Sequence, residues 1–279
     1  MRRFVDKVAV ITGAGSGIGR ALALDLAGRG ARLAISDISQ QRIEETVALC
    51  AERGAQAKGY VLDVADRAAV LAHANEVLDA FGRANLVINN AGVALTAPIL
   101  EMSWEDLEWV MNIDFWGVVH GTKAFLPHLI ASGDGHIVNI SSVFGLVGVP
   151  TQSAYNAAKF AVRGFTEALR QEMSIGRHPV GVSCVHPGGV RTNIARDARG
   201  NAEFESSTVR ERFDKTMPTS PAKAAQIILR GVQANRPRIL VGPDAYAFDA
   251  TARILGPSYQ RITAGAARVA GLFGVKLGS

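Results

Sequence analysis

The sequence contains little cysteine and no long hydrophobic run. Only two of its 279 residues are cysteines, Cys50 and Cys184, and both lie among apolar neighbours. This pattern is typical of buried thiols rather than of a disulfide framework, so we expect a protein of a reducing compartment. Because no stretch of about 18 apolar residues occurs, no helix is expected to span a membrane.

Other signatures are also missing. Histidines and cysteines do not cluster at the spacing of a metal site, so no metal is expected. Charged residues follow Met1 too closely for the apolar region of a signal peptide, which predicts a cytoplasmic location. The formal net charge is +5, but the basic residues are scattered and form no stripe with aromatic residues. This distribution argues against a nucleic-acid partner and suits a small anionic molecule.

What the sequence does contain is an alternation of short apolar runs with longer helical patterns. Strands are expected at Lys7–Thr12, Arg32–Ser36, Ala57–Leu62, Leu86–Asn89, His136–Ser141, Val180–Val185 and Arg238–Val241. Helices are expected at Ile18–Arg29, Gln40–Arg53, Arg67–Phe81, Ser103–Phe115, Gly117–Ala131, Ser153–Ile175 and Pro221–Ala234. Strands separated by helices form right-handed βαβ units. The expected fold class is therefore α/β, a Rossmann-type doubly wound parallel sheet of about seven strands with helices on both faces. We expect a single domain, with residues 1–242 as its main part and residues 243–279 as a helical extension.

A glycine-rich turn joins the first strand to the first helix. It contains Gly13, Gly17 and Gly19 at the spacing G-x-x-x-G-x-G. Glycines allow a pyrophosphate to approach the backbone closely, and the helix behind the turn directs its unpaired N–H groups at the same place. Because the spacing departs from the usual G-x-G-x-x-G fingerprint, an ordinary strand–helix turn is the alternative.

An acidic residue, Asp37, ends the second strand. A carboxylate at this place can accept hydrogen bonds from the adenosine ribose, whereas a 2′-phosphate would meet like charge. Neither Ser16 in the turn nor Ile38 is basic, so the sequence favours NAD over NADP. The alternative is that Asp37 caps the next helix, although Ser39 is better placed to do so.

Tyr155 and Lys159 are spaced i, i+4 on one face of an expected helix. A phenol titrates near about 10, and a nearby ammonium group or an oxidised nicotinamide would lower that pKa. Ser142 ends the fifth strand, and the carboxyl ends of such strands line the ligand crevice. Taken alone, the tyrosine and lysine could belong to a solvated helix face, and Ser142 could be a helix cap.

Six motifs in this order make the sequence resemble the classical short-chain dehydrogenase/reductase family, from about Lys7 to Val241. They are Thr12–Gly19, Asp63-Val64, Asn89–Gly92, Asn112, Ser142 with Tyr155–Lys159, and Pro187–Thr192. The resemblance implies that Tyr155 is the general acid/base and that Lys159 lowers its pKa and binds the nicotinamide ribose. It implies that Ser142 positions the substrate oxygen, and that the backbone of Asn112 holds a water connecting Lys159 to solvent.

The resemblance also implies a nucleotide site. It would consist of Gly13, Ser16, Gly17, Ile18, Gly19, Asp37, Asp63, Val64, Asn90, Tyr155, Lys159, Val190 and Thr192. Asp63 and Val64 would contact the adenine and Asn90 the adjacent ribose. Val190 and Thr192 would contact the carboxamide and phosphate.

The expected function is the transfer of a hydride between NAD(H) and a secondary alcohol or ketone. The substrate pocket is expected between Val93–Pro98, Val143–Pro150 and a polar segment, Arg191–Met217, that could act as a lid. A moderately lipophilic substrate is favoured unless the apolar residues there are core: Leu95, Leu146, Val147, Val149, Phe204, Phe213 and Met217. Two alternatives stay open, an NADP(H)-dependent ketoreductase of the same family and a dinucleotide-binding sensor without catalysis.

The resemblance further implies a homotetramer or homodimer built on the helices near Gly117–Ala131 and Ser153–Ile175. The tail, Gly256–Ser279, is basic and apolar, and we expect it to pack at a subunit contact or to fray rather than to lie on a membrane. His120, His128 and His136 are interpreted as structural.

Overall fold

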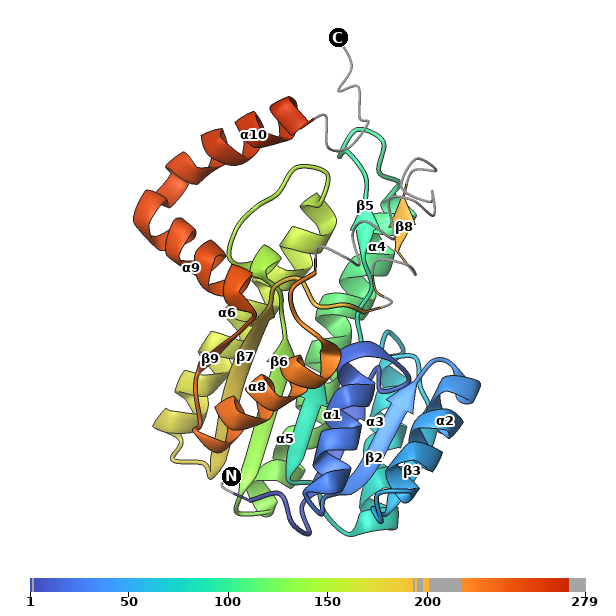
Figure 1. Cartoon of the computed structure of the whole chain (residues 1–279). Helices are drawn as coiled ribbons and strands as arrows, with labels where there is room; N and C mark the ends of the chain where they lie inside the picture. Colours follow the sequence, from blue (N-terminus) through green and yellow to red (C-terminus); the bar gives the residue numbers. More distant parts are fainter. Residues whose placement is uncertain (2, 193, 195–197, 201–216, 271–279) are drawn as a thin grey trace.

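A parallel sheet forms the centre of the protein (Figure 1). The structure is a computed structural model and describes residues 1, 3–192, 194, 198–200 and 217–270. Within these residues the main sheet has seven strands in the order β3-β2-β1-β4-β6-β7-β9. The strands are β1 (Val8–Thr12), β2 (Arg32–Asp37), β3 (Ala57–Val61), β4 (Leu86–Asn89), β6 (Gly135–Ile140), β7 (Val180–Pro187) and β9 (Arg238–Val241). The order reverses at β1 and β4, which is where a ligand crevice opens in such sheets.

Helices cover both faces of the sheet, as predicted. They are α1 (Gly17–Gly28), α2 (Gln40–Ala51), α3 (Arg67–Phe81), α4 (Trp104–Met111), α5 (Gly117–Ala131), α6 (Ser153–Ile175) and α8 (Pro221–Gln233). Alternate residues of β1 point to opposite faces. Ala9 and Ile11 pack with α1 and α8, whereas Val8 and Val10 pack with α3 and α5. Each face of the sheet therefore has its own hydrophobic core.

The expected strands and most of the expected helices differ from those observed by no more than two residues at either end. Two short strands were not expected, β5 (Leu95–Thr96) and β8 (Arg199–Gly200), which pair with each other outside the main sheet. The expected helix Ser103–Phe115 is also different. It ends at Met111 and continues as a π-helical turn, η1 (Asn112–Trp116), that leads directly into α5. Among the described residues, no helix is long and apolar enough to cross a membrane.

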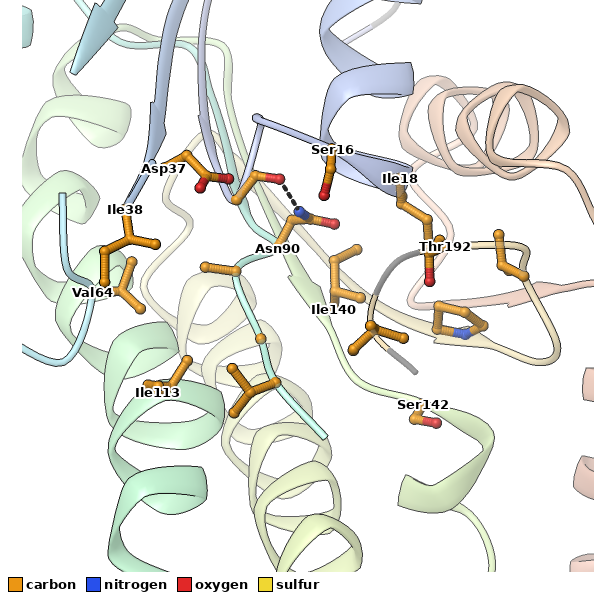
Figure 2. Close-up of a pocket in the computed structure, with 18 of the residues that line it drawn as sticks. Ser16, Ile18, Asp37, Ile38, Val64, Asn90, Ile113, Ile140, Ser142 and Thr192 are labelled. Atoms are coloured by element: carbon orange, nitrogen blue, oxygen red, sulfur yellow. Dashed lines mark hydrogen bonds between the residues drawn. The ribbon is translucent and has the colours of Figure 1, made fainter. Parts of the chain in front are cut away.

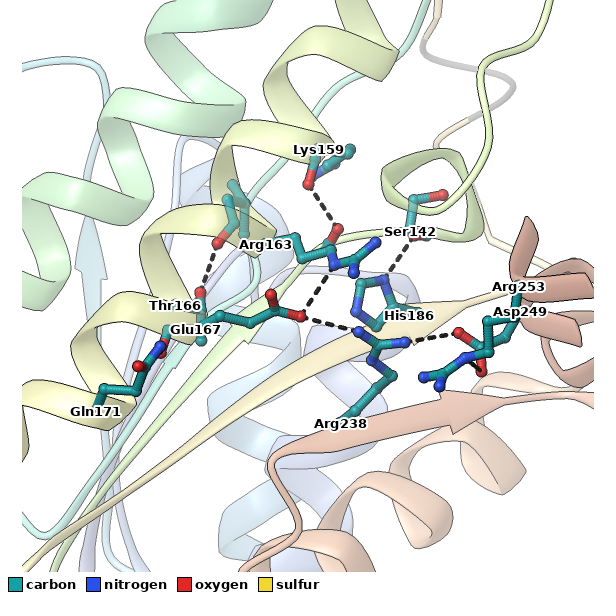
Figure 3. A network of polar contacts seen from close by, with 12 residues as sticks. Ser142, Lys159, Arg163, Thr166, Glu167, Gln171, His186, Arg238, Asp249 and Arg253 are labelled. Carbon is teal, nitrogen blue, oxygen red and sulfur yellow. Dashed lines mark hydrogen bonds and ion pairs between the residues drawn. The ribbon is translucent and has the colours of Figure 1, made fainter. Parts of the chain in front are cut away.

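The end of the described chain is helical and lies beyond the carboxyl ends of the strands (Figure 1). It consists of α9 (Pro243–Leu255), the short turn η5 (Gly256–Ser258) and α10 (Tyr259–Ala270). A chain of ion pairs ties α9 to the sheet and to α6. Arg238 on β9 lies 2.7 Å from the carboxylate of Asp249 and 2.9 Å from that of Glu167 (Figure 3). At the start of α10, the Tyr259 hydroxyl accepts a hydrogen bond from Gly148 N at 2.8 Å.

Candidate active site

A cavity of about 410 Å³ lies at the carboxyl ends of the central strands. It brings together nearly all of the predicted site residues: Gly13, Ser16, Gly17, Ile18, Asp37, Asp63, Val64, Asn90, Ser142, Tyr155, Lys159, Val190 and Thr192. Asp37 lies at one end and Ser142 toward the other (Figure 2). Two predicted residues, Gly19 and Asn112, do not line the cavity. Residues from distant parts of the sequence thus form one continuous site.

The glycine-rich turn is held against the end of β4. The Thr12 hydroxyl accepts hydrogen bonds from Asn90 N and Ala91 N, both at 3.0 Å. Asn90 Nδ2 in turn donates to the carbonyls of Thr12 and Gly13 at 2.9 and 3.2 Å. Gly19 has a structural role here, because a Cβ at this residue would lie 2.2 Å from Gly13 O. The helix can therefore approach the turn closely only with glycine at this position.

Asp37 is fixed at the edge of the same turn. Its Oδ2 accepts a hydrogen bond from Gly15 N at 2.9 Å, and its Oδ1 accepts one from Ser39 N at 3.1 Å. Ser39 caps α2, accepting from Arg42 N at 3.4 Å, so Asp37 is not the cap of that helix. Arg42 also lines the cavity near Asp37, and the sequence analysis had not singled it out.

The loop after β6 carries Ser142 and is held by several side chains. The Ser142 hydroxyl accepts a hydrogen bond from Phe144 N at 3.1 Å. Asn156 Nδ2 donates to Phe144 O and Val147 O, at 2.6 and 2.8 Å. Behind the loop, His186 on β7 donates through Nδ1 to Ser142 O at 2.9 Å (Figure 3). Asn156 and His186 were not predicted as site residues. Their hydrogen bonds to the backbone of the loop keep Ser142 in place.

Tyr155 lies in the first turn of α6, between Ser142 and Lys159. Its ring packs edge-to-face against Phe144, with 6.1 Å between the centroids. Lys159 Nζ lies 5.4 Å from the centre of the tyrosine ring, and hydrogen bonding by the Ser142 side chain lowers the pKa of the Tyr155 phenol. The phenol, the ammonium group and the serine hydroxyl thus lie in the mutual arrangement expected from the sequence.

A buried carboxylate, Asp114, completes this group. Asp114 lies in the π turn and has no exposed surface, while Lys159 is 3% exposed. Their charged atoms, Asp114 Oδ2 and Lys159 Nζ, are 3.0 Å apart. Asp114 Oδ1 also accepts a hydrogen bond from Val93 N at 2.7 Å.

Asn112 does not line the cavity. Asn112 is exposed, and its carbonyl accepts the hydrogen bond of Gly117 N within the π turn. The π turn directs Asp114, two residues later, toward Lys159 instead. A carboxylate rather than an asparagine is therefore the neighbour of the lysine.

The electrostatic balance at Tyr155 also differs from the expectation. Burial raises the pKa of the Tyr155 phenol, the Lys159 ammonium lowers it, and the Asp114 carboxylate raises it again. The net direction is upward, so Lys159 alone does not bring the phenol into the neutral range. For Lys159 itself, the Asp114 carboxylate outweighs burial and raises the pKa, so the lysine stays charged.

Comparison with known proteins agrees with this geometry. Residues 7–203 match the short chain dehydrogenase family. The chain belongs to that family. It is 57% identical over 265 residues to the oxidoreductase SadH of Mycobacterium tuberculosis, a match that covers 95% of this chain and 96% of that protein.

Two further relatives extend the match. C alpha-dehydrogenase of Sphingobium is 34% identical over 255 residues, covering 88% of this chain and 83% of that protein. A short-chain dehydrogenase from Burkholderia phymatum, solved in complex with NAD, has a TM-score of 0.84 at 33% identity and covers 94% of this chain and 97% of that one. The protein is therefore an oxidoreductase of the short-chain dehydrogenase family with a nicotinamide cofactor.

The substrate side of this short-chain dehydrogenase differs in part from the sequence-based expectation. Leu95, Leu146 and Val147 are buried core residues and do not line the cavity, and neither does Val149. The apolar lining beyond Ser142 and Tyr155 includes Val93, Trp109 and Ile194. Arg199 of β8 lies over the Trp109 ring, 3.9 Å from its centroid. Phe204 and Phe213 of the expected lid lie outside the described residues.

The three histidines interpreted as structural do not line the cavity. His120 Nδ1 is hydrogen-bonded to Val64 O at 3.1 Å, and His136 Nε2 to the Ser183 hydroxyl at 2.9 Å. Burial lowers the pKa of His136 to about 3, so its ring is neutral in the folded protein. A proton relay through these residues has no support.

Proposed function

We propose that this short-chain dehydrogenase transfers a hydride between NAD(H) and a secondary alcohol or ketone, with Tyr155 as the general acid/base. The observation that carries the proposal is that Tyr155, Lys159 and Ser142 share one cavity with Asp37 and the glycine-rich turn. A group that transfers a proton to or from the substrate oxygen then lies beside a site for the dinucleotide that exchanges a hydride with the carbon bonded to that oxygen. This is the arrangement that alcohol–ketone chemistry requires.

The donor set of the cavity fits a nicotinamide dinucleotide. Ser16 makes no side-chain cap on α1, so the first N–H groups of that helix stay available to a pyrophosphate. Asp37 and Asn90 would bind the adenosine ribose, Asp63 and Val64 the adenine, and Val190 and Thr192 the nicotinamide end, with Gly13, Gly17 and Ile18 around the phosphates. When bound, the nicotinamide supplies the hydride acceptor or donor.

Tyr155 Oη is the atom that carries the proton in this proposal. In alcohol oxidation it accepts the hydroxyl proton while the C–H bond of the alcohol carbon breaks; in ketone reduction it returns the proton to the carbonyl oxygen. The Ser142 hydroxyl accepts a hydrogen bond from Phe144 N, and its own hydrogen would turn from Tyr155 to the substrate oxygen when substrate binds. Lys159 holds its charge beneath the phenol and would bind the nicotinamide ribose.

The substrate is proposed to be a moderately lipophilic alcohol or ketone. Val93, Trp109 and Ile194 offer apolar surface in the cavity, which suits a lipophilic substrate. These lining residues support a lipophilic substrate, although they are not the apolar residues from which the sequence analysis inferred it.

Cofactor choice can be tested on the wild-type protein and on one variant. We expect NAD⁺ to raise the unfolding temperature more than NADP⁺ at equal concentration. Asp37→Asn keeps an oxygen for Gly15 N–H but removes the charge that repels a 2′-phosphate. The ratio of the NADP⁺ and NAD⁺ Kd values should therefore fall about tenfold or more, which corresponds to about 1.4 kcal/mol. Asp79→Asn, an exposed aspartate on α3, is the charge-matched control.

The second candidate is an NADP(H)-dependent ketoreductase, and Arg42 is the observation that favours it. Arg42 lines the cavity beside the turn that Asp37 closes, where a guanidinium group could bind a 2′-phosphate. A larger thermal shift with NADP⁺ than with NAD⁺, abolished by Arg42→Ala, would establish this candidate. Saturable cofactor binding without turnover on a broad panel of alcohols and ketones would instead indicate a sensor without catalysis.

We also propose a homodimer or homotetramer built on α5 and α6. Trp116 and Phe160 are 47% and 39% exposed at this side of the molecule. Phe115 packs against both Trp116 and Phe165 there, with centroid distances of 5.3 and 6.4 Å. An apolar surface of this kind is what a subunit contact would cover. A single monomeric species in light scattering at micromolar concentration would contradict this assembly.

The proposed location is the cytoplasm. Cys50 and Cys184 are both free and buried, as a reducing compartment allows. We also retain the division of the chain into a catalytic part, residues 1–242, and an extension, residues 243–279. Fractionation of cells that express the protein would test the location.

A further inference from the structure

The buried pair of Asp114 and Lys159 presents an unusual charge arrangement beneath the phenol. Lys159 Nζ lies 3.0 Å from Asp114 Oδ2 and also donates to Ile140 O at 3.3 Å. Gly92 permits this packing, because a Cβ there would lie 3.2 Å from Asp114 Oδ1 and 3.3 Å from Lys159 Nζ. The ammonium group therefore lies between the Asp114 carboxyl group on one side and the tyrosine ring on the other.

Few other charges act on this cluster within the described residues. Lys159 is the charged group that acts on Asp114, and Asp114, Tyr155 and Cys184 are those that act on Lys159. Burial raises the pKa of the Cys184 thiol on β7 to about 12, so that thiol stays neutral. The electrostatics of the phenol are thus governed by one cation and one anion, from α6 and from the π turn.

We propose that Asp114 tunes the acid/base site: its carboxylate offsets the charge that Lys159 presents to Tyr155 Oη, and so biases the enzyme toward proton donation, and hence ketone reduction, near neutral pH. This inference rests on the proposed function of Tyr155. Asp114 contacts Lys159 and acts on Tyr155 through its charge. It is therefore a positioning residue rather than a catalytic one.

The direction of the effect follows from the signs of the charges. A nearby cation stabilises the phenolate and a nearby anion destabilises it, each by an amount that depends on distance and burial. Lys159 lowers the pKa of Tyr155 and Asp114 raises it. With Asp114 ionised, the phenol keeps its proton at pH values where Lys159 alone would have removed it. Alcohol oxidation, which needs the phenolate, then requires a higher pH, while the overall equilibrium of the reaction is unchanged.

The test is an ultraviolet titration of tyrosinate in the protein without cofactor. The chain has four tyrosines, and subtraction of the Tyr155→Phe titration isolates the signal of Tyr155. Asp114→Asn keeps an oxygen for Val93 N–H and removes the charge. We expect it to lower the Tyr155 midpoint by about one pH unit or more. The acidic limb of the pH profile for alcohol oxidation, which rises as the phenolate forms, should move to lower pH by a similar amount. Asp79→Asn, on the exposed face of α3, should leave both unchanged.

A midpoint that does not move in Asp114→Asn would overturn the inference. If that variant does not fold, Asp114→Asn/Lys159→Met decides, because it removes both charges of the pair. Where the two charges offset each other, the Tyr155 midpoint of the double variant rises by less than about one unit. A larger rise would mean that Lys159 acts without an opposing charge, which contradicts the inference.

These outcomes are separate from a failure of the proposed function. If Tyr155→Phe kept its turnover, the assignment of the acid/base would be lost. The titration would still report whether Asp114 controls the ionisation of the phenol. Conversely, an inactive Tyr155→Phe together with an immobile Tyr155 midpoint in Asp114→Asn would preserve the proposed function and remove only the tuning role.

Discussion

Tyr155→Phe should lower kcat/KM for alcohol oxidation by about 10²–10⁴-fold, the usual contribution of a positioned acid or base. The variant loses only the hydroxyl, and its ring can keep the edge-to-face contact with Phe144. The affinity for NAD⁺ should therefore change by no more than a few-fold. Steady-state kinetics with a substrate found in an alcohol panel, together with calorimetric titration of NAD⁺, measures both quantities.

The matched control for this substitution is Tyr246→Phe. Tyr246 is on α9 and 57% exposed, so the loss of its hydroxyl should leave turnover at the wild-type level. Turnover of Tyr155→Phe within a few-fold of the wild type, with NAD⁺ still bound, would remove Tyr155 from the mechanism.

Lys159→Met should lower the free energy of unfolding by about 3–5 kcal/mol, because it leaves the Asp114 carboxylate buried without its partner. Asp114 has no exposed surface, and its other polar contact is the single hydrogen bond from Val93 N. Asp114→Asn/Lys159→Met removes both charges and should recover most of the loss. Urea unfolding without cofactor measures these differences, and Lys123→Met, on an exposed part of α5, is the control.

The pH dependence of the stability of Lys159→Met tests the same explanation. Burial raises the pKa of Asp114 above its unfolded value, and the loss of Lys159 raises it further. The folded variant then binds a proton that the unfolded chain releases, so its instability grows as the pH rises through the folded pKa of Asp114 and shrinks in acid. A deficit that is equal at acid and neutral pH, or that persists in the double variant, would show that the ion pair is not its cause.

Much of the fold could be predicted from sequence because its signals are local. Apolar runs such as Arg32–Ser36 mark the ends of strands within one or two residues. Glycines that directly follow a helical pattern mark the ends of helices equally well. The pair of β5 and β8 could not be predicted, since two residues carry no periodicity and their pairing joins segments more than a hundred residues apart. The π turn could not be predicted from the apolar residues either, because the helical periodicity continues on both sides of it.

The same π turn explains why one site residue was missed. Ser142, Tyr155 and Lys159 are placed by regular geometry, a strand end and one turn of helix, and all three line the cavity as expected. Asn112 was placed by motif alone, whereas the wider turn directs Asp114 to the lysine. A signal was present: Asp114 is a single acid between Ile113 and Phe115 in a helical pattern. A charge in such surroundings is buried only with a partner.

The most direct test of the central claim follows a deuterium atom. A panel of secondary alcohols deuterated at the carbinol carbon is incubated with the wild-type protein and NAD⁺, and the mass of the reduced cofactor is determined. Because Tyr155 is proposed to take only the hydroxyl proton, the deuterium should appear on the nicotinamide ring, and no deuterium should be lost to solvent. Tyr155→Phe should give no product on the same time scale. Reduced cofactor without the label, or equal labelling by Tyr155→Phe, would contradict the account.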